Sequence, residues 1–259
     1  MRKYDFIIPC GSTCVNAHNL RVNKLQRESL PFDWIWVSGI PMLTSFFENK
    51  FQNFMLKENL VHLRGNGDAD IYRDTATKTE FWHDFMIGDD FEKSYFENYN
   101  KYQRRISRMF SRIDNANSIL FVHTAKIYPN KEKSEDDFMF ENNIQQPEEL
   151  KKQFSVLQKL YPSKKLHLLI FYLYEDEHEF KEYDISTDIH ICEMQNHPKY
   201  GWKGDAQLFS QVLKNYDLTP SSKLYYFFNT LKFNSYKLFL RICAILGSKS
   251  CKQKLKKRH

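Results

Sequence analysis

Short apolar runs alternate with segments of helical periodicity along most of the chain. The runs that predict buried strands are 4–9, 118–124, 166–174 and 188–194. The helical patterns cover 15–26, a stretch within 31–55, 95–113, 147–160 and 205–213. Because continuous apolar strands separated by helices are typical of parallel sheets covered on both faces, we expect an α/β fold with a mainly parallel central sheet in three layers.

The pattern also predicts where this domain ends. We expect the α/β domain over residues 1–217, followed by an appendage over 218–259 that consists of a basic amphipathic helix and tail. Within the domain, the polar stretch RGNGDADIYRDTATKTE predicts a loop before FWHDF.

Charge is concentrated in the appendage. No acidic residue follows Asp217, whereas ten of the 38 basic residues do, so the preceding part carries 28 basic and 32 acidic side chains, a net charge of −4. Segment 224–246 is rich in aromatic residues and leucine, which suits a helix lying on an anionic membrane surface. The segment is not expected to span a membrane, because its apolar run is interrupted by Lys232, Lys237 and Arg241. The alternative is a helix docked on the core. A nucleic-acid partner is not expected, because the body is slightly acidic and shows no recognition motif.

The remaining composition narrows the class of protein. With 42% hydrophobic residues, 259 residues can bury a large core. The N-terminal apolar stretch is too short for a signal peptide, so we expect a cytoplasmic protein, peripheral at the inner face of the membrane if the tail binds lipid. Five scattered cysteines indicate reduced thiols. Cys10 and Cys14 have no second Cys or His pair at ligand spacing, so we expect no metal site.

The turn PCGSTC after the first strand offers a candidate nucleophile. Gly11 permits a sharp turn, and Ser12 or Thr13 as helix cap would place Cys14 in the first helical turn. There, backbone N–H groups and the helix dipole favour a thiolate, and the same N–H groups can hold an oxyanion. The alternative is that Cys14 is a small buried residue behind a capped helix. Cys10, on the strand, fits the core.

A nucleophilic cysteine needs a base, and His83 in FWHDF is the best candidate because it follows a polar stretch and lies between aromatic residues. The histidines ranked behind it are His123, His197 and the neighbouring His18. Asp205 in GWKGD can orient a histidine as the third member of a triad, although an aspartate before a helical run is also an ordinary N-cap. Asp84 is a weaker orienter, because adjacent side chains diverge.

Several stretches together resemble a known family. They are IIPCGSTCVNAHNLRVNKLQRESLPFDWIWVS, FENKFQNFM, FWHDF, YNKYQRRISRM and SILFVHT. They are similar to a bacterial family of unknown function catalogued as papain-like cysteine peptidases, over about residues 4–125 with a fainter match at GWKGD. The resemblance implies a Cys/His hydrolase site carried by Cys14 and His83, with Arg104 and Arg105 in the family's RRI position.

A second resemblance concerns only the first turn. A family of capsular-polysaccharide acetyltransferases that binds coenzyme A has a comparable small-residue turn with a cysteine after its first strand. Arg104, Arg108 and Arg112 share one helical stripe that can meet phosphates, or that is simply a solvated face. For a hydrolase we expect no cofactor. In the acyltransferase alternative, coenzyme A is the expected acyl donor.

Taken together, the sequence predicts a cysteine-dependent acyl-transfer enzyme acting on a peptide, a glycan or a small molecule. The competing hypothesis is a non-catalytic, membrane-peripheral component of surface-polysaccharide assembly. The hydrophobic pattern and the family resemblance predict different architectures. The strand-first order of the pattern places the nucleophile beside a parallel sheet, whereas papain-like enzymes place it on a helix packed against an antiparallel sheet.

Overall fold

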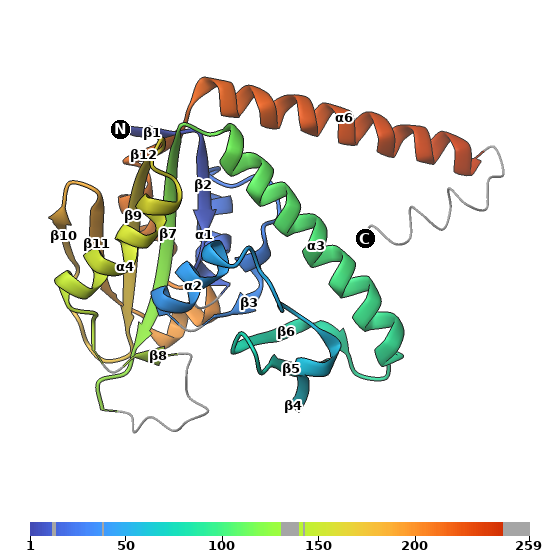
Figure 1. The fold of residues 1–259 in the computed structure, drawn as a ribbon, viewed down its shortest axis with the longest axis horizontal. Helices are drawn as coiled ribbons and strands as arrows, with labels where there is room; N and C mark the ends of the chain where they lie inside the picture. The colour runs from blue at the N-terminus through green and yellow to red at the C-terminus, as the bar shows by residue number, and fades with distance from the viewer. Residues whose placement is uncertain (12–13, 38, 131–139, 142, 246–259) are drawn as a thin grey trace. The chain divides into compact units, whose positions relative to one another are not determined.

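The structure is a computed structural model that describes residues 1–11, 14–37, 39–130, 140–141 and 143–245 (Figure 1). The chain divides into two compact units, Met1–Asp217 and Leu218–His259. The first unit contains two large β-sheets with helices packed on them, and the described part of the second is mainly one long helix.

The larger sheet is mainly parallel, as the sequence predicts. Its parallel strands, from one edge inward, are β2 (Phe6–Pro9), β7 (Ser118–Ile127), β9 (Lys165–Tyr174) and β11 (Ile189–Gln195) (Figure 1). The short strand β8 (Phe140–Glu141) pairs with the end of β7, and β10 (Lys181–Ser186) adds an antiparallel strand at the far edge. Strand β2 therefore forms one border of the sheet and β10 the other.

Helices pack on both faces of this sheet. On one face lie α2 (Gly39–Glu48), α3 (Phe91–Asn115) and α4 (Pro147–Leu160), which share a buried apolar core with it. Phe121 of β7 faces this side and contacts the ring of Phe47. On the other face lie α1 (Val15–Val22) and α5 (Ala206–Leu213), where Phe171 of β9 contacts the ring of Phe209. The apolar runs predict these strands because both strand faces are covered.

The second sheet is antiparallel and was not predicted. Its order is β3 (Ile35–Trp36), β6 (Thr79–Met86), β5 (Ala69–Asp74) and β4 (Leu60–Asn66). The loop predicted over RGNGDADIYRDTATKTE is therefore wrong, because most of that stretch belongs to β4, β5 and the start of β6. Strand β4 carries many exposed residues, several of them polar, and Gly67 at φ +60° makes the tight turn between β4 and β5.

The first helix is shorter than predicted. The pattern extends it to residue 26, whereas α1 ends at Val22. Lys24 adopts φ +60°, the N–H of Leu25 donates to the carbonyl of Leu20, and the N–H of Lys24 donates to that of Arg21. This is the Schellman arrangement, which ends a helix regardless of the apolar spacing that follows.

The remaining short elements connect these layers. They are β1 (Arg2–Tyr4), which pairs with β12 (Tyr216–Leu218), and the 3-10 helices η1 (Pro31–Asp33), η2 (Lys57–Asn59) and η3 (Pro198–Lys203).

In the second unit, α6 (Pro220–Ile245) is the predicted C-terminal helix. Its exposed large side chains are Leu224, Tyr225, Phe227, Phe228, Leu231, Phe233, Tyr236, Leu238 and Phe239. The basic cluster after it lies outside the described residues. Over the part of the chain that the structure describes, no helix has the length and hydropathy of a membrane-spanning segment.

Candidate active site

The turn that carries Cys14 is pressed against the middle of β7. The backbone N–H of Cys10 donates to the carbonyl of Val122 at 2.9 Å, and the side-chain amide of Asn16 donates to the same oxygen. A Cβ at Gly11 would collide with Oγ1 of Thr124 and lie 3.0 Å from its backbone nitrogen. Glycine is therefore required here by close approach of two backbones.

Cys14 begins α1 directly. It is the N-cap residue and makes no side-chain capping hydrogen bond, and the predicted caps Ser12 and Thr13 lie outside the described part of the chain. The side chain of Cys14 is only 8% exposed. Burial raises the pKa of the Cys14 thiol, and neither the backbone N–H at the helix start nor the charge of Lys126 outweighs it. The resting form of Cys14 is therefore the thiol, whereas the sequence predicts a thiolate.

Lys126 is a neighbour that the sequence analysis missed. It lies near the end of β7, and its ammonium group is 5.8 Å from the ring centroid of Trp36. Burial lowers the pKa of Lys126, whereas the interaction with Cys14 raises it. The position could have been found, because side chains at the carboxyl ends of parallel strands surround the same region as the first strand-to-helix turn.

His83 lies on the antiparallel sheet, in an irregular stretch of β6. Between the pairs Asp70–Phe85 and Tyr72–Phe81 the register shifts, so that β6 bulges around His83. Its imidazole is exposed and meets the ring of Trp34 edge-on, with centroids 6.3 Å apart. Bulges re-aim side chains, and this one allows a histidine on a strand to reach a tryptophan from the segment before β3.

A row of four rings connects His83 to the helix that carries Cys14. Trp34 contacts Trp202 of η3, with centroids 6.4 Å apart, and Trp202 contacts His18 of α1 at 5.1 Å. His18 lies one helical turn after Cys14, and its backbone N–H donates to the carbonyl of Cys14. The row therefore runs His83, Trp34, Trp202, His18, with one histidine at each end.

The GWKGD segment is fixed to α1 by its backbone. The side-chain amide of Asn19 donates to the carbonyl of Lys203 at 2.8 Å. Gly204 adopts φ +68°, and a Cβ there would lie 3.2 Å from Val15 and 2.9 Å from the ring of Phe209. This packing holds the GWKGD segment, which is far from Cys14 in sequence, against the helix that follows Cys14.

Two other motif pieces form an ion pair that is buried on its acidic side. Arg21 pairs with Asp33, whose side chain is fully buried and also accepts from Gln26 and the backbone of Leu30. The guanidinium of Arg21 lies over the ring of Trp34, 5.3 Å from its centroid. Arg21 and Asp33 thus hold Trp34 in place, a role that the sequence analysis did not assign.

Cys14 and His83 are not in direct contact. Within the described residues, no hydrogen bond joins the Cys14 thiol to a histidine. His18 is nearer to Cys14 in the sequence than His83 is. Burial and the positive charges of Lys203 and Arg21 lower the pKa of His18. A neutral imidazole that can accept a proton therefore follows Cys14 by one helical turn.

Two further histidines have structural partners. His123 is buried, and its Nδ1 is 2.8 Å from the carbonyl oxygen of Cys10. Burial lowers the pKa of His123 to about 4, so this ring stays neutral at physiological pH. His197 caps η3 by accepting from the N–H of Lys199. Cys10 itself is buried in the core, as expected.

The two candidate orienting carboxylates serve other groups. Asp205 accepts from the N–H groups of Gln207 and Leu208, so the capping alternative is confirmed, and within the described residues no hydrogen bond joins it to a histidine. Asp84 accepts from the hydroxyl of Tyr102 at 2.7 Å and pairs with Lys101, both on α3. It anchors the bulged strand to that helix.

The arginines of α3 are spread over different surroundings. Arg104 is exposed, and the guanidinium of Arg105 lies over the ring of Tyr102. Arg108 and Arg112 both pair with Glu28, at 3.8 and 3.3 Å. The predicted phosphate-binding stripe is thus partly neutralised by an acidic partner.

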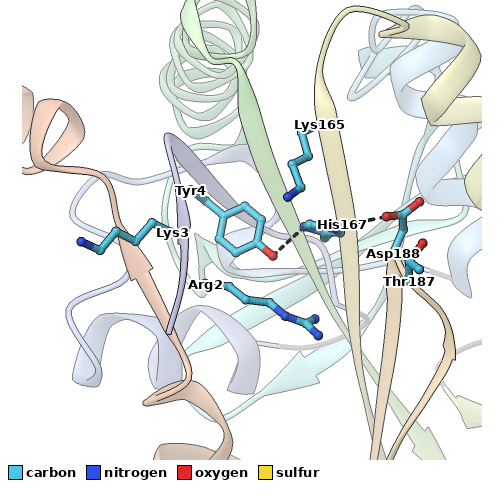
Figure 2. Close-up of a pocket in the computed structure, with 7 residues that line it drawn as sticks. All are labelled: Arg2, Lys3, Tyr4, Lys165, His167, Thr187 and Asp188. Atoms are coloured by element: carbon cyan, nitrogen blue, oxygen red, sulfur yellow. Dashed lines mark hydrogen bonds and ion pairs between the residues drawn. The ribbon is translucent and has the colours of Figure 1, made fainter.

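A separate pocket of about 320 Å³ lies near the amino ends of the parallel strands, away from the Cys14 turn. The hydroxyl of Tyr4 is 2.6 Å from Nδ1 of His167, and Nε2 of His167 is 3.4 Å from the Asp188 carboxylate (Figure 2). Lys165 and Arg2 flank this chain of contacts, whereas the side chain of Lys3 extends away from it (Figure 2). Burial is the main cause of the lowered pKa of His167.

The first unit thus contains a cysteine at a helix start and a histidine on a separate antiparallel sheet. Residues 5–160 match the family described as "Putative papain-like cysteine peptidase (DUF1796)". The match spans more than half of the chain, and the chain belongs to this family.

A curated relative adds no activity to this picture. The chain is 30% identical over 149 residues to "Uncharacterized protein R408" of Acanthamoeba polyphaga mimivirus. The aligned region covers 51% of this chain and 66% of the relative. The match therefore spans just under two thirds of that protein's length. No solved structure matches the chain.

Proposed function

We propose that this protein is a cysteine-dependent acyl-transfer enzyme that hydrolyses an amide or ester bond, with Cys14 as nucleophile and His83 as general base. The observation that supports the proposal is the row of rings, in which His83 contacts Trp34 at one end and His18, on the helix after Cys14, contacts Trp202 at the other. Membership of the family supports the same chemistry.

The raised pKa of the Cys14 thiol determines the order of events. Because the resting thiol is protonated, the base removes its proton as sulfur attacks the substrate carbonyl. The oxyanion is held by N–H groups at the start of α1, and the charge of Lys126 stabilises the thiolate. The imidazolium then protonates the departing amine or alcohol, and water hydrolyses the thioester to regenerate the thiol.

The surroundings favour a substrate with an apolar or ring-shaped group beside its carbonyl. Trp202 is 50% exposed, and Trp34 is partly exposed beside it. Arg21 lies over one of these rings and Lys203 near the other. Flat rings flanked by cations can bind a peptide side chain or a sugar face, and they favour substrates with a nearby negative charge.

Trapping of the acyl-enzyme tests this proposal. The full chain is incubated with p-nitrophenyl acetate and, separately, with a panel of fluorogenic peptide amides, and acylated peptides are located by mass spectrometry. We expect an acetyl group on Cys14, absent in Cys14→Ala and retained in Cys192→Ala. Acylation confined to other residues would overturn the proposal. Turnover only with a coenzyme A thioester and an added glycan acceptor would assign acyl transfer in place of hydrolysis.

The identity of the base is tested by a matched pair of variants. His83→Ala should lower the rate of acylation by about 10²- to 10⁴-fold, the usual contribution of a general base. His18→Ala, at the other end of the row, should have a smaller effect. The reverse ranking would assign the base to His18.

For the second unit, we propose binding to an anionic membrane surface. The exposed aromatic and leucine side chains of α6 alternate with Lys232, Lys237 and Arg241, and no acidic residue follows Asp217. The full chain should sediment with vesicles that contain phosphatidylserine and should not sediment with phosphatidylcholine vesicles. A chain truncated after Thr219 that still binds would refute the proposal.

A further inference from the structure

The antiparallel pair β10 and β11 gathers four metal-ligating or metal-supporting side chains on one face. In its register, Glu182 is opposite Cys192 and Asp184 is opposite His190. Residues two apart on a strand share a face, so these two directly opposed pairs form a compact square.

Three of the four have donor atoms that lie close to one another. A carboxylate oxygen of Glu182, a ring nitrogen of His190 and the sulfur of Cys192 all lie within 4.8 Å of one another. Nε2 of His190 is 2.9 Å from Oε1 of Glu182. In a tetrahedral zinc site the ligand atoms are about 3.3 to 3.8 Å apart, so only small side-chain movements separate this cluster from one.

The fourth side chain contacts the other ring nitrogen of His190. Oδ1 of Asp184 is 2.8 Å from Nδ1 of His190. A histidine that donates from Nδ1 to a carboxylate presents Nε2 as an acceptor, which is the usual orientation of zinc-bound histidines. The other oxygen of Asp184 faces Arg2 at 4.0 Å, so this carboxylate is positioned from both sides.

From this geometry we propose that Glu182, His190 and Cys192 bind a divalent transition-metal ion, with zinc as the best fit, and that Asp184 is its supporting carboxylate. Sulfur, imidazole and carboxylate donors together favour zinc over the calcium and magnesium that oxygen-only sites select. Three protein ligands leave a fourth position for water. The proposal does not depend on the proposed hydrolase function.

The environment of Cys192 supports the exchange of a proton for a metal ion. Cys192 is fully buried, and the carboxylate side chains of Glu182 and Asp184 lie on the same face of the strand pair. Their negative charges attract a cation. When the metal–sulfur bond forms, the thiol proton is released to solvent and the metal charge compensates the carboxylates and the thiolate.

Cobalt titration of the full chain tests the site without reference to activity. We expect one equivalent of Co²⁺ to produce tetrahedral d–d bands and a thiolate-to-cobalt charge-transfer band, and Zn²⁺ to displace it. Cys192→Ser should abolish the charge-transfer band, whereas Cys14→Ser and Cys243→Ser should retain it. A band that survives Cys192→Ser, or no binding by the wild-type chain, would refute the site.

Glu182 and Asp184 are exposed, so substituting them tests the site without disturbing the buried core. Asp184→Asn should weaken binding by about 10- to 100-fold, the usual loss for a supporting carboxylate, and Glu182→Gln should weaken it more. Glu177→Gln, which changes an exposed carboxylate on the nearby loop, is the matched control and should bind normally. Equal weakening in all three variants would show only a nonspecific effect of negative charge and would contradict the proposal.

Discussion

Cys14 and Cys192 lie near opposite borders of the same parallel sheet, beside β2 and on β11. Both thiols are buried, and burial is the largest cause of the raised pKa of each. Their charged neighbours differ in sign. Cys14 has the helix start and Lys126, which favour a thiolate, whereas Cys192 has Glu182 and Asp184, which oppose one.

The comparison teaches that burial alone does not define what a thiol does. At Cys14, the positive surroundings reduce the cost of a transient thiolate, which suits a nucleophile activated by a base during attack. At Cys192, a lasting thiolate requires a cation to compensate two carboxylates, which suits a metal ligand. The charges around each thiol are therefore the reason that we propose different chemistry for the two cysteines.

The largest predicted effect is on ester hydrolysis, which should distinguish Cys14 from Cys192. Cys14→Ala should lower the hydrolysis of an activated ester by about 10³-fold or more, because the nucleophile is lost. Cys192→Ala should leave the rate within a fewfold of the wild-type rate. Initial rates with p-nitrophenyl acetate measure both. Equal losses in the two variants would remove the distinction between nucleophile and ligand.

The second prediction changes the charge beside Cys14. Lys126→Met removes a positive charge that lowers the pKa of Cys14, so the pKa should rise and the rate of alkylation by iodoacetamide at pH 7 should fall by up to about tenfold. Lys126→Arg keeps the charge and serves as the control. A rate that is unchanged in Lys126→Met would show that the helix N–H groups alone stabilise the thiolate.

The third prediction concerns stability at alkaline pH. Because the folded state raises the pKa of both thiols, above about pH 8.5 the unfolded chain loses protons that the folded chain retains. The free energy of unfolding should therefore fall with rising pH, by up to about 1.4 kcal/mol per pH unit for each thiol. Urea denaturation of the reduced, metal-free chain measures this slope. Cys192→Ala should make it shallower, and an unchanged slope would contradict the raised pKa of Cys192.

The smallest effect tests a side chain near the Cys14 site that has only a structural partner. Asp205→Ala removes the cap of α5 and should lower the free energy of unfolding by about 1 kcal/mol, whereas Asp205→Asn should retain most of it. Both should leave the alkylation rate of Cys14 unchanged. A large loss of esterase activity in the folded Asp205→Asn variant would restore Asp205 as a member of the catalytic site.

The sequence by itself determined the parallel strands, the long helix α3, the helix α4 and the position of Cys14 at a strand-to-helix turn. These features depend on neighbours a few residues away, where apolar spacing and capping residues act directly. The α4 prediction has the observed limits for this reason, since Pro147 starts it and the apolar stripe continues to Leu160.

Only the tertiary structure decided the antiparallel sheet, the ring contacts of His83 and the direction of the pKa of Cys14. Polar strands such as β4 and β5 form because partner strands satisfy their backbones, which no local pattern reveals. Likewise, Lys126 is 112 residues from Cys14, and the square of Glu182, Asp184, His190 and Cys192 exists only through strand register. Burial and charge are properties of what the fold brings near a side chain, so the chemistry of each thiol could not be derived from its own segment.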